Sequence, residues 1–219
     1  MTRPWQTIAR AETPEGALEL RQRGTADFLI TIAGRVLMTS QARRSEEALA
    51  ELPLKNRKPR DVLVGGLGMG YTLRAALDRL APDARVTVVE LNPVVAEWCR
   101  GPLAPLTGAA VADPRVTVAL ADVGDHLARA PRGAYDTILL DLYEGPHAAT
   151  QRPNDPLYGA QALGRTRAAL RDGGVFAVWS EEADAPFERR LADAGFSVEK
   201  HRAGRGGRAH VVYLGYNSR

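Results

Sequence analysis

The sequence predicts an α/β protein in which a mostly parallel seven-stranded sheet carries helices on both faces, preceded by a small β-hairpin region. From residue 61 onward, strand-like apolar runs alternate with segments of helical composition, which is the pattern of a covered parallel sheet. Before that point, four short strand-like runs are separated by the turn residues Gly16, Gly24 and Gly34. We therefore expect a hairpin region over residues 1–53 and a larger domain over residues 54–219.

The expected elements follow in chain order. In the N-terminal region we expect strands at residues 5–10, 17–21, 28–32 and 35–39, followed by a helix at 45–52. In the larger domain we expect strands at 62–64, 85–89, 116–120, 137–140 and 175–179, and helices at 71–80, 93–100, 123–130, 161–170 and 186–194. The helix at 161–170 is expected to end at Gly173-Gly174. Residues 197–201 and 210–216 complete the seven strands as an antiparallel hairpin at the sheet edge.

Composition and charge narrow the class of protein. The 219 residues are 45% hydrophobic and 25% charged, as in an ordinary globular protein. No apolar run approaches the ~20 residues of a transmembrane helix, and the start does not resemble a signal peptide, so we expect a cytoplasmic protein without membrane association. The charge of +3 comes partly from Arg-rich stretches that lack interleaved aromatic residues, so nucleic acid is not an expected partner. Cys99, the single cysteine, is expected to be a packed thiol, and no metal site is expected.

A glycine cluster follows the first strand of the larger domain. Residues 65–70, here called the glycine loop, contain Gly65, Gly66, Gly68 and Gly70 and lead into the next expected helix. Such a loop lets the backbone approach a ligand at a helix N-terminus, because a Cβ would block that approach. A tight turn that needs glycine for structural reasons explains the cluster equally well.

Acidic residues end three successive strands of the expected sheet. Glu90, followed by Leu91, lies about twenty residues after the glycine loop, where a carboxylate accepts ribose hydroxyls. Asp122, followed by Val123, is a candidate partner of an adenine amino group or an N-cap of the next helix. Asp141 ends the fourth strand. Together the three acids predict a nucleoside site at the carboxyl edge of a Rossmann-like sheet.

The loop after Asp141 is where we expect the chemistry. Tyr143, Glu144 and His147 follow it directly; His147 is a candidate orienting group or an ordinary surface residue. The Pro-rich segment 150–158, which includes Tyr158, is either a lid over the substrate or a rigid surface loop. Trp179 ends the fifth strand and either lines the acceptor side or belongs to the core.

Several motifs occur in a fixed order over nearly the whole chain. They are Trp5-Gln6-Thr7-Ile8, Gly34-Arg35-Val36-Leu37-Met38-Thr39, Ser45-Glu46-Glu47, Val62-Leu63-Val64-Gly65-Gly66, Val89-Glu90-Leu91-Asn92-Pro93, Asp113-Pro114-Arg115-Val116, Tyr135-Asp136 and residues 141–146. In this order they resemble the spermidine synthase family, the polyamine aminopropyltransferases. The resemblance implies a Rossmann-like methyltransferase fold, a homodimer and an S-adenosylmethionine-type donor held partly by Gln6. It also implies an acceptor near Glu46, with Asp141 helping to deprotonate the attacking amine and Glu144 as the second acid.

Departures from the family pattern shape the functional prediction. The family's glycine loop carries an aspartate for the amine of decarboxylated S-adenosylmethionine, whereas this chain has Leu67-Gly68-Met69. Without that carboxylate, the loop N–H groups favour the carboxylate of intact S-adenosylmethionine, which predicts methyl transfer to a small molecule. Two alternatives remain: an aminopropyltransferase that holds the donor amine through Gln6, Glu46 or Glu47, and a catalytically silent nucleoside-binding homologue.

Overall fold

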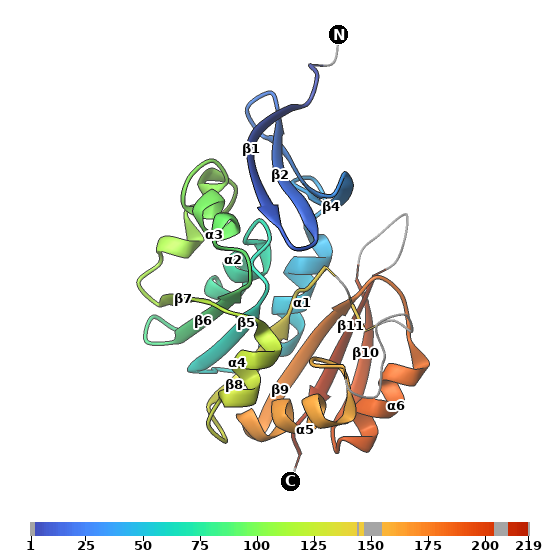
Figure 1. Ribbon diagram of the computed structural model, residues 1–219. Coiled ribbons are helices and arrows are strands. Elements are labelled where there is room, and N and C mark those ends of the chain that lie inside the picture. The colour runs from blue at the N-terminus through green and yellow to red at the C-terminus, as the bar shows by residue number, and fades with distance from the viewer. Residues whose placement is uncertain (1–2, 144, 147–154, 204–209, 219) are drawn as a thin grey trace.

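The computed structural model describes residues 3–143, 145–146, 155–203 and 210–218 and contains two sheets (Figure 1). The smaller sheet has the order β1-β2-β3-β4, and the larger has the order β10-β11-β9-β8-β5-β6-β7. The N-terminal elements are β1 Gln6–Thr13, β2 Gly16–Arg23, β3 Asp27–Ile32, β4 Arg35–Thr39 and α1 Arg44–Leu54. The strands of the large sheet are β5 Asp61–Gly65, β6 Arg85–Glu90, β7 Val116–Leu120, β8 Tyr135–Leu140, β9 Leu170–Ser180, β10 Ser197–Ala203 and β11 His210–Tyr216.

The large sheet is mostly parallel, which confirms the predicted fold class. Strands β6, β5, β8 and β9 pair in parallel along the middle of the sheet, and β7 extends it at one edge. At the other edge β11 pairs antiparallel with both β9 and β10, so the predicted hairpin is present. The chain therefore forms a Rossmann-like α/β sheet with one antiparallel strand.

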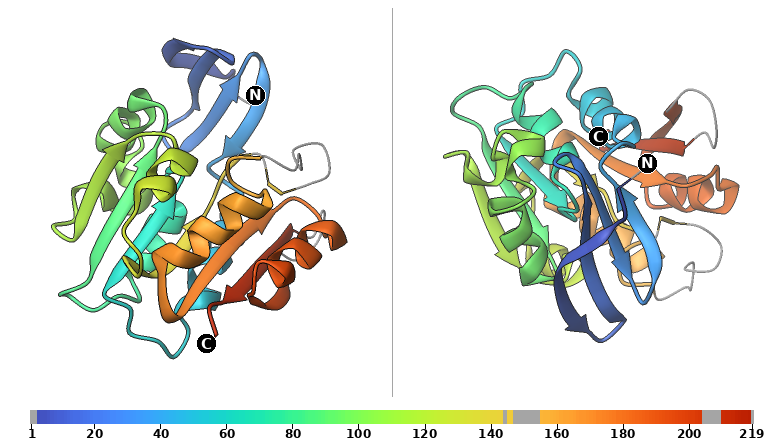
Figure 2. Two further views of the ribbon diagram at one scale, coloured as in Figure 1. Left: turned by 60° about the horizontal axis from the view of Figure 1, so that its bottom comes forward. Right: turned by 90° about the horizontal axis from the view of Figure 1, so that it is seen from above.

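Helices cover both faces of the large sheet (Figure 2). They are α2 Tyr71–Leu77, α3 Pro93–Arg100, α4 Val123–Arg129, α5 Ala160–Ala169 and α6 Ala185–Asp193, with the short 3₁₀ helices η1 Ala104–Thr107 and η2 Ala110–Ala112 after α3. One apolar cluster joins α1, α2 and α3 to the sheet through residues such as Leu49, Leu73 and Ala96. A second cluster joins α4, α5 and α6 through Leu127 and Leu191. Burial on both faces explains why the central strands read as continuous apolar runs.

The N-terminal sheet is fastened to the large domain next to the glycine loop. The Tyr71 hydroxyl donates a hydrogen bond of 2.9 Å to the Ser40 carbonyl, and buried side chains of β2 and β3 belong to the cluster that also contains α1 and α2. The carboxyl edge of the large sheet therefore lies beneath this small sheet (Figure 1). Pro53 lies in the last turn of α1, and the expected division at residue 53 stays a prediction.

One predicted boundary in the larger domain is wrong. The helix expected to end at Gly173-Gly174 ends at Ala169, and β9 begins at Leu170 in an extended conformation. The two glycines instead continue the strand, because Gly173 N–H donates to the Asn217 carbonyl and Asn217 N–H donates to the Gly174 carbonyl. A backbone partner from the far end of the chain thus overrides the local stop signal.

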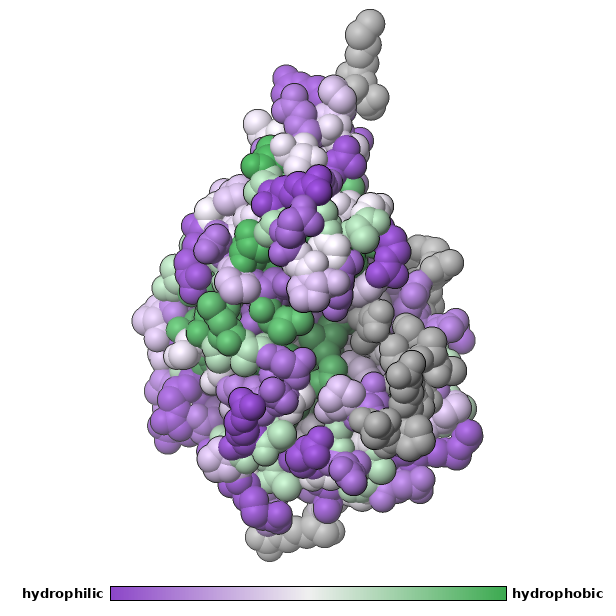
Figure 3. All heavy atoms as spheres, viewed as in Figure 1, coloured by the Kyte–Doolittle hydropathy of each residue, from purple (hydrophilic) through white to green (hydrophobic). Residues whose placement is uncertain are grey.

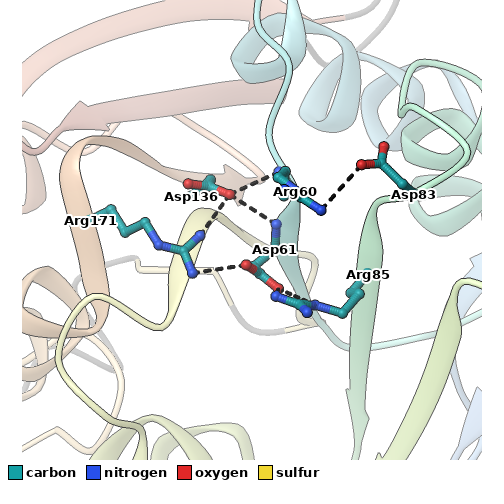
Figure 4. A network of polar contacts seen from close by, with 6 residues as sticks. All are labelled: Arg60, Asp61, Asp83, Arg85, Asp136 and Arg171. Carbon is teal, nitrogen blue, oxygen red and sulfur yellow. Dashed lines mark hydrogen bonds and ion pairs between the residues drawn. The ribbon is translucent and has the colours of Figure 1, made fainter.

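A charged network ties the strands together at the opposite, amino edge of the large sheet (Figure 4). One Asp136 carboxylate oxygen accepts from the N–H groups of Arg60 and Asp61, at 2.8 and 2.9 Å, and forms an ion pair with Arg171 at 2.8 Å. Asp61 joins Arg171 to Arg85, at 2.8 and 2.6 Å. Burial raises the pKa of Asp136, but these hydrogen bonds outweigh burial and leave the pKa below its usual value. The network stabilises the fold and leaves the carboxyl edge for chemistry.

None of the helices in the described part of the chain combines the length and apolar character needed to span a membrane. The same residues hold no group of three or more His, Cys, Asp or Glu side chains suited to a metal ion.

Candidate active site at the carboxyl edge

The glycines of the loop at residues 65–70 are required by the protein's own packing. Gly66, Gly68 and Gly70 have φ angles of +86°, +51° and +85°, which glycine adopts without strain. A Cβ on Gly65 would lie 2.6 Å from a Leu140 methyl, and a Cβ on Gly66 would overlap the Asp141 carbonyl oxygen. These contacts bring β5 close to the end of β8, so the structural explanation of the cluster holds whether or not a ligand binds.

The N–H groups of the loop are largely used within the protein. Their acceptors are Val89 O for Gly66 at 2.9 Å, Glu90 Oε2 for Leu67 at 2.9 Å, Met38 Sδ for Met69 at 3.2 Å and Leu67 O for Gly70 at 2.8 Å. The expectation that these groups are left to favour a ligand carboxylate is therefore wrong. Such a carboxylate would need another partner at this edge.

Glu90 lies at the end of β6 with its carboxylate beneath the loop. One oxygen accepts from Leu67 N–H and the other from Asn92 N–H, at 2.9 and 2.8 Å, and the residue is 7% exposed. Burial raises its pKa, while the N–H groups of Asn92, Leu67 and Leu91 counteract this effect. Leu91 next to it is 55% exposed, and Leu120, which pairs with Glu90 from β7, is 56% exposed. An acid between two exposed apolar side chains is a suitable setting for a ribose with an attached base.

Asp122 and Val123 stand at the start of α4. Asp122 Oδ1 accepts from Asp125 N–H at 2.9 Å, so the N-cap alternative is confirmed for this side chain. Val123 is 5% exposed and packs where a Cβ on Gly65 would lie. Their roles in donor binding stay predictions.

Asp141 forms the acidic centre of the site. Its carboxylate accepts a hydrogen bond from the Thr72 hydroxyl at 2.6 Å, and Thr72, in the first turn of α2, is 1% exposed. Burial, followed by the negative charge of Glu46 on α1, raises the pKa of Asp141 to about 7, although the Thr72 hydrogen bond lowers it. The Ser45 hydroxyl donates to Glu46 at 2.7 Å. The fold thus brings two carboxyl groups from α1 and the end of β8 together, and the charge of Glu46 adds to the rise in the pKa of Asp141.

The loop after Asp141 is described in part. Tyr143 is 43% exposed, and the Arg35 guanidinium carbon lies 5.5 Å from the centre of its ring. Glu144 and His147 lie outside the described residues. Gln6, exposed at the start of β1, stays a predicted donor residue.

Two predicted acceptor residues occupy different surroundings. Tyr158 is 2% exposed and packs edge-on against Phe187 at 5.6 Å between ring centres, within the cluster of α4, α5 and α6. Trp179 is half-buried, and its ring centre lies 5.1 Å from that of His210. It belongs to the sheet face that carries α1, on the strand beside β8. Trp179 therefore shares a sheet face with the helix that bears Glu46, whereas Tyr158 is a core residue on the opposite face; the acceptor roles of both stay predictions.

Three residues near the site were not singled out from the sequence. Thr72 is the second residue of α2, the Met38 sulfur accepts a hydrogen bond from Met69 N–H in the glycine loop, and Arg35 lies against Tyr143. Only the position of Thr72, directly after the glycine loop, offered a sequence signal. Met38 and Arg35 reach the site through the placement of the small sheet over the large one, which no local pattern reveals.

Comparisons with known proteins agree with this architecture. No protein family model matches the chain. A polyamine aminopropyltransferase from Corynebacterium efficiens is 34% identical over 164 residues, covering 74% of this chain and 30% of that protein. Polyamine aminopropyltransferase 2 from Pseudomonas aeruginosa is 32% identical over 185 residues, covering 77% and 52%. Putrescine N-methyltransferase 3 from Nicotiana tabacum is 33% identical over 136 residues, covering 62% and 34%. The chain thus spans about a third to a half of the length of these relatives.

Solved structures show the same fold. The spermidine synthase from Thermotoga maritima superimposes with a TM-score of 0.79 at 19% identity, over 97% of this chain and 73% of that one. A spermidine synthase in complex with the transition state analogue AdoDATO gives a TM-score of 0.78 at 18% identity, with the same coverage. The fold of the chain is that of a spermidine-synthase-like protein. The resemblance of this chain to the spermidine synthase family is therefore confirmed.

Proposed function

We propose that this chain is an S-adenosylmethionine-dependent transferase of spermidine-synthase-like fold that methylates a small-molecule amine. The observation that carries the proposal is the pair of carboxyl groups of Asp141 and Glu46, one with a pKa raised to about 7, at the carboxyl edge of a Rossmann-like sheet. An acid with a strongly raised pKa beside a second acid is a candidate for proton transfer at neutral pH. A homodimeric, cytoplasmic protein is part of the same proposal.

The described residues fit a nucleoside donor. Glu90 offers a buried carboxylate, and the exposed side chains of Leu91 and Leu120 flank it with apolar surface. Apolar side chains also gather on the face beneath the N-terminal sheet (Figure 3). When bound, such a donor supplies an electrophilic carbon attached to a sulfonium ion. Glu90 would exchange its bonds to Leu67 and Asn92 for the ribose hydroxyls, while the leucines would pack against the base.

The glycine loop favours the intact donor over its decarboxylated form. The loop bears no acid, and the space that a side chain at Gly68 would need is taken by Met38, whose sulfur lies 2.8 Å from the ideal Cβ position. An uncharged thioether there offers no carboxylate to an ammonium group. It also does not repel the carboxylate of intact S-adenosylmethionine, so the transferred group in this proposal is methyl.

The acidic pair suits an amine acceptor. An ammonium group next to Asp141 and Glu46 is attracted by their negative charge, and it lowers the pKa of Asp141 by stabilising the carboxylate. Asp141, held by Thr72, then accepts a proton from the amine so that the nitrogen lone pair is free to attack. Tyr143 and Trp179 are proposed to position the acceptor.

Aminopropyl transfer is the second candidate. It is favoured by the two polyamine aminopropyltransferases among the relatives, whereas the methyl reading is favoured by the putrescine N-methyltransferase. In this reading Gln6, Glu46 or Glu47 holds the amine of decarboxylated S-adenosylmethionine. A catalytically silent nucleoside-binding protein would bind a donor and transfer neither group.

Product analysis tests the proposal. The purified chain is incubated with putrescine and either intact or decarboxylated S-adenosylmethionine, and the nucleoside products are separated by chromatography. Release of S-adenosylhomocysteine that is lost in Asp141→Asn supports methyl transfer. Methylthioadenosine from the decarboxylated donor supports aminopropyl transfer, and donor binding without either product for a panel of diamines supports the silent homologue.

A further inference from the structure

Arg35 of the N-terminal sheet lies beside the loop after Asp141. Arg35 opens β4, and its guanidinium carbon lies 5.5 Å from the centre of the Tyr143 ring. Within the part of the chain that the structure describes, Arg35 forms no ion pair with a carboxylate. A face-on aromatic contact at an exposed site is weak compared with a bidentate pair to a carboxylate. The guanidinium is therefore available to an anionic ligand.

The strand register puts Arg35 on the same face as Met38. Arg35 pairs with Ile32 and Met38 pairs with Ile30, because a register shift between Ile30 and Thr31 adds one residue to β4. Residues opposite each other in an antiparallel pair share a face of the sheet. Ile30 and Ile32 are both 3% exposed and belong to the cluster that joins the small sheet to the large domain. Arg35 and Met38 thus both lie on the face turned toward the large sheet.

This face of β4 spans the donor end of the site. Met38 contacts the glycine loop at Gly68 and Met69, and Arg35 contacts the loop two residues after Asp141. Their partners Ile30 and Ile32 are two residues apart on β3, so at about 3.3 Å per residue the two side chains leave the sheet about 7 Å apart. Tyr143 follows Asp141 by two residues, so the Arg35 guanidinium lies close in the fold to the residue that the sulfonium end of a donor must approach.

Four N–H groups of the glycine loop already have acceptors within the protein, so the donor carboxylate needs a further partner at this edge. Other arginines near the site are engaged: Arg43 pairs with Glu47 at 3.3 Å, and Arg74 pairs with Asp78 at 2.6 Å. We propose that Arg35 binds the α-carboxylate of intact S-adenosylmethionine and thereby sets the preference of this site for the intact donor. The inference rests on the proposed function and assigns its donor specificity to a residue of the N-terminal sheet.

Calorimetric titration of the full chain with intact and with decarboxylated S-adenosylmethionine tests the assignment in four proteins. They are the wild type, Arg35→Gln, Arg35→Lys and Arg44→Gln. Arg44 is the matched control, because it is exposed, lies at the start of α1 and has no ion pair among the described residues. We expect Arg35→Gln to raise the Kd of the intact donor about 10- to 100-fold, the usual effect of losing a charge-assisted contact, and to leave the Kd of the decarboxylated donor unchanged. Arg35→Lys keeps the positive charge but lacks the planar fork of the guanidinium, so it should raise the Kd of the intact donor by a smaller factor.

Two results would overturn the assignment to Arg35. In the first, Arg35→Gln leaves the ratio of the two Kd values unchanged; in the second, Arg44→Gln raises the Kd of the intact donor as much as Arg35→Gln does. In each of these cases the proposed function stands if the wild type still prefers the intact donor. A wild type that prefers the decarboxylated donor or binds neither overturns both the assignment and the proposed function. Matching thermal unfolding midpoints of the four proteins show that any loss arises in the site.

Discussion

Replacing Thr72 with valine isolates the hydrogen bond that holds Asp141. The substitution keeps the volume and branching of a side chain that is 1% exposed, and removes only the hydroxyl that lies 2.6 Å from the Asp141 carboxylate. A hydrogen bond to a charged group contributes about 1.5 to 3 kcal/mol, which corresponds to about 1 to 2 pKa units. The lower end applies because the same hydroxyl also lies 3.3 Å from the Glu46 carbonyl oxygen. We therefore expect Thr72→Val to raise the pKa of Asp141 by about one unit.

The assay is a titration of aspartate carboxyl ¹³C resonances by NMR, with Asp141→Asn identifying the signal. In the wild type the Asp141 signal should titrate at about 7. Glu46→Gln removes the neighbouring negative charge, so it should lower the pKa, whereas Thr72→Val should raise it. Two variants that shift the signal in the same direction, or a wild-type pKa near 4, would refute the account of the acidic pair.

Other expected outcomes concern stability, donor binding and reactivity. Asp141→Asn should stabilise the protein against heat by about 3 kcal/mol more at pH 8 than at pH 5, because the raised pKa penalises the ionised carboxyl in the folded state as pH rises from about 4 through about 7; equal stabilisation at the two pH values would contradict this sign. Asp136→Ala should destabilise the fold by about 3 kcal/mol in urea unfolding, since it leaves Arg171 and two backbone N–H groups without their acceptor, and a change below about 0.5 kcal/mol would show that the network is not structural. Glu90→Ala should weaken binding of either donor at least about 10-fold in calorimetry, a loss that Glu97→Ala on the surface of α3 should not reproduce. Cys99 should resist a thiol reagent at pH 8 in the folded protein, because burial, followed by the charge of Glu90, raises its pKa to about 12; modification at the rate of an unfolded control would be the contrary result.

The fold was predictable because its main signals are local. Apolar runs of strand length alternate with amphipathic segments, and both the parallel sheet and the terminal hairpin follow from that alternation. The insertion of β11 between β9 and β10 and the extension of β9 through Gly173-Gly174 depend on pairing with the chain end, so they required the structure.

The site was predictable in part for the same reason. Glu90 and Asp141 end strands of the sheet, so their position at the carboxyl edge follows from the pattern alone. The caps, contacts and charges around them do not follow from it. Asp122 turned out to cap α4, Tyr158 turned out to lie in the core, and the N–H groups of the glycine loop turned out to be occupied.

The contacts that Arg35 and Met38 of the N-terminal sheet make at the site were beyond sequence reasoning. The extra residue in β4 puts Arg35 and Met38 on one face, and the register shift that causes it has no signature in the chain. Thr72 reaches Asp141 only because β5 and β8 are neighbours in the sheet, a pairing between segments about 75 residues apart in the chain.

We propose that the carboxyl edge of the large sheet binds an S-adenosylmethionine-type donor and prefers its intact form. Calorimetric titration of the purified chain with intact and with decarboxylated S-adenosylmethionine, repeated on Glu90→Ala, measures this preference directly. We expect tighter binding of the intact donor and loss of binding in Glu90→Ala. Preference for the decarboxylated donor would contradict the methyl reading, and binding of neither donor by the wild type would contradict the nucleoside site itself.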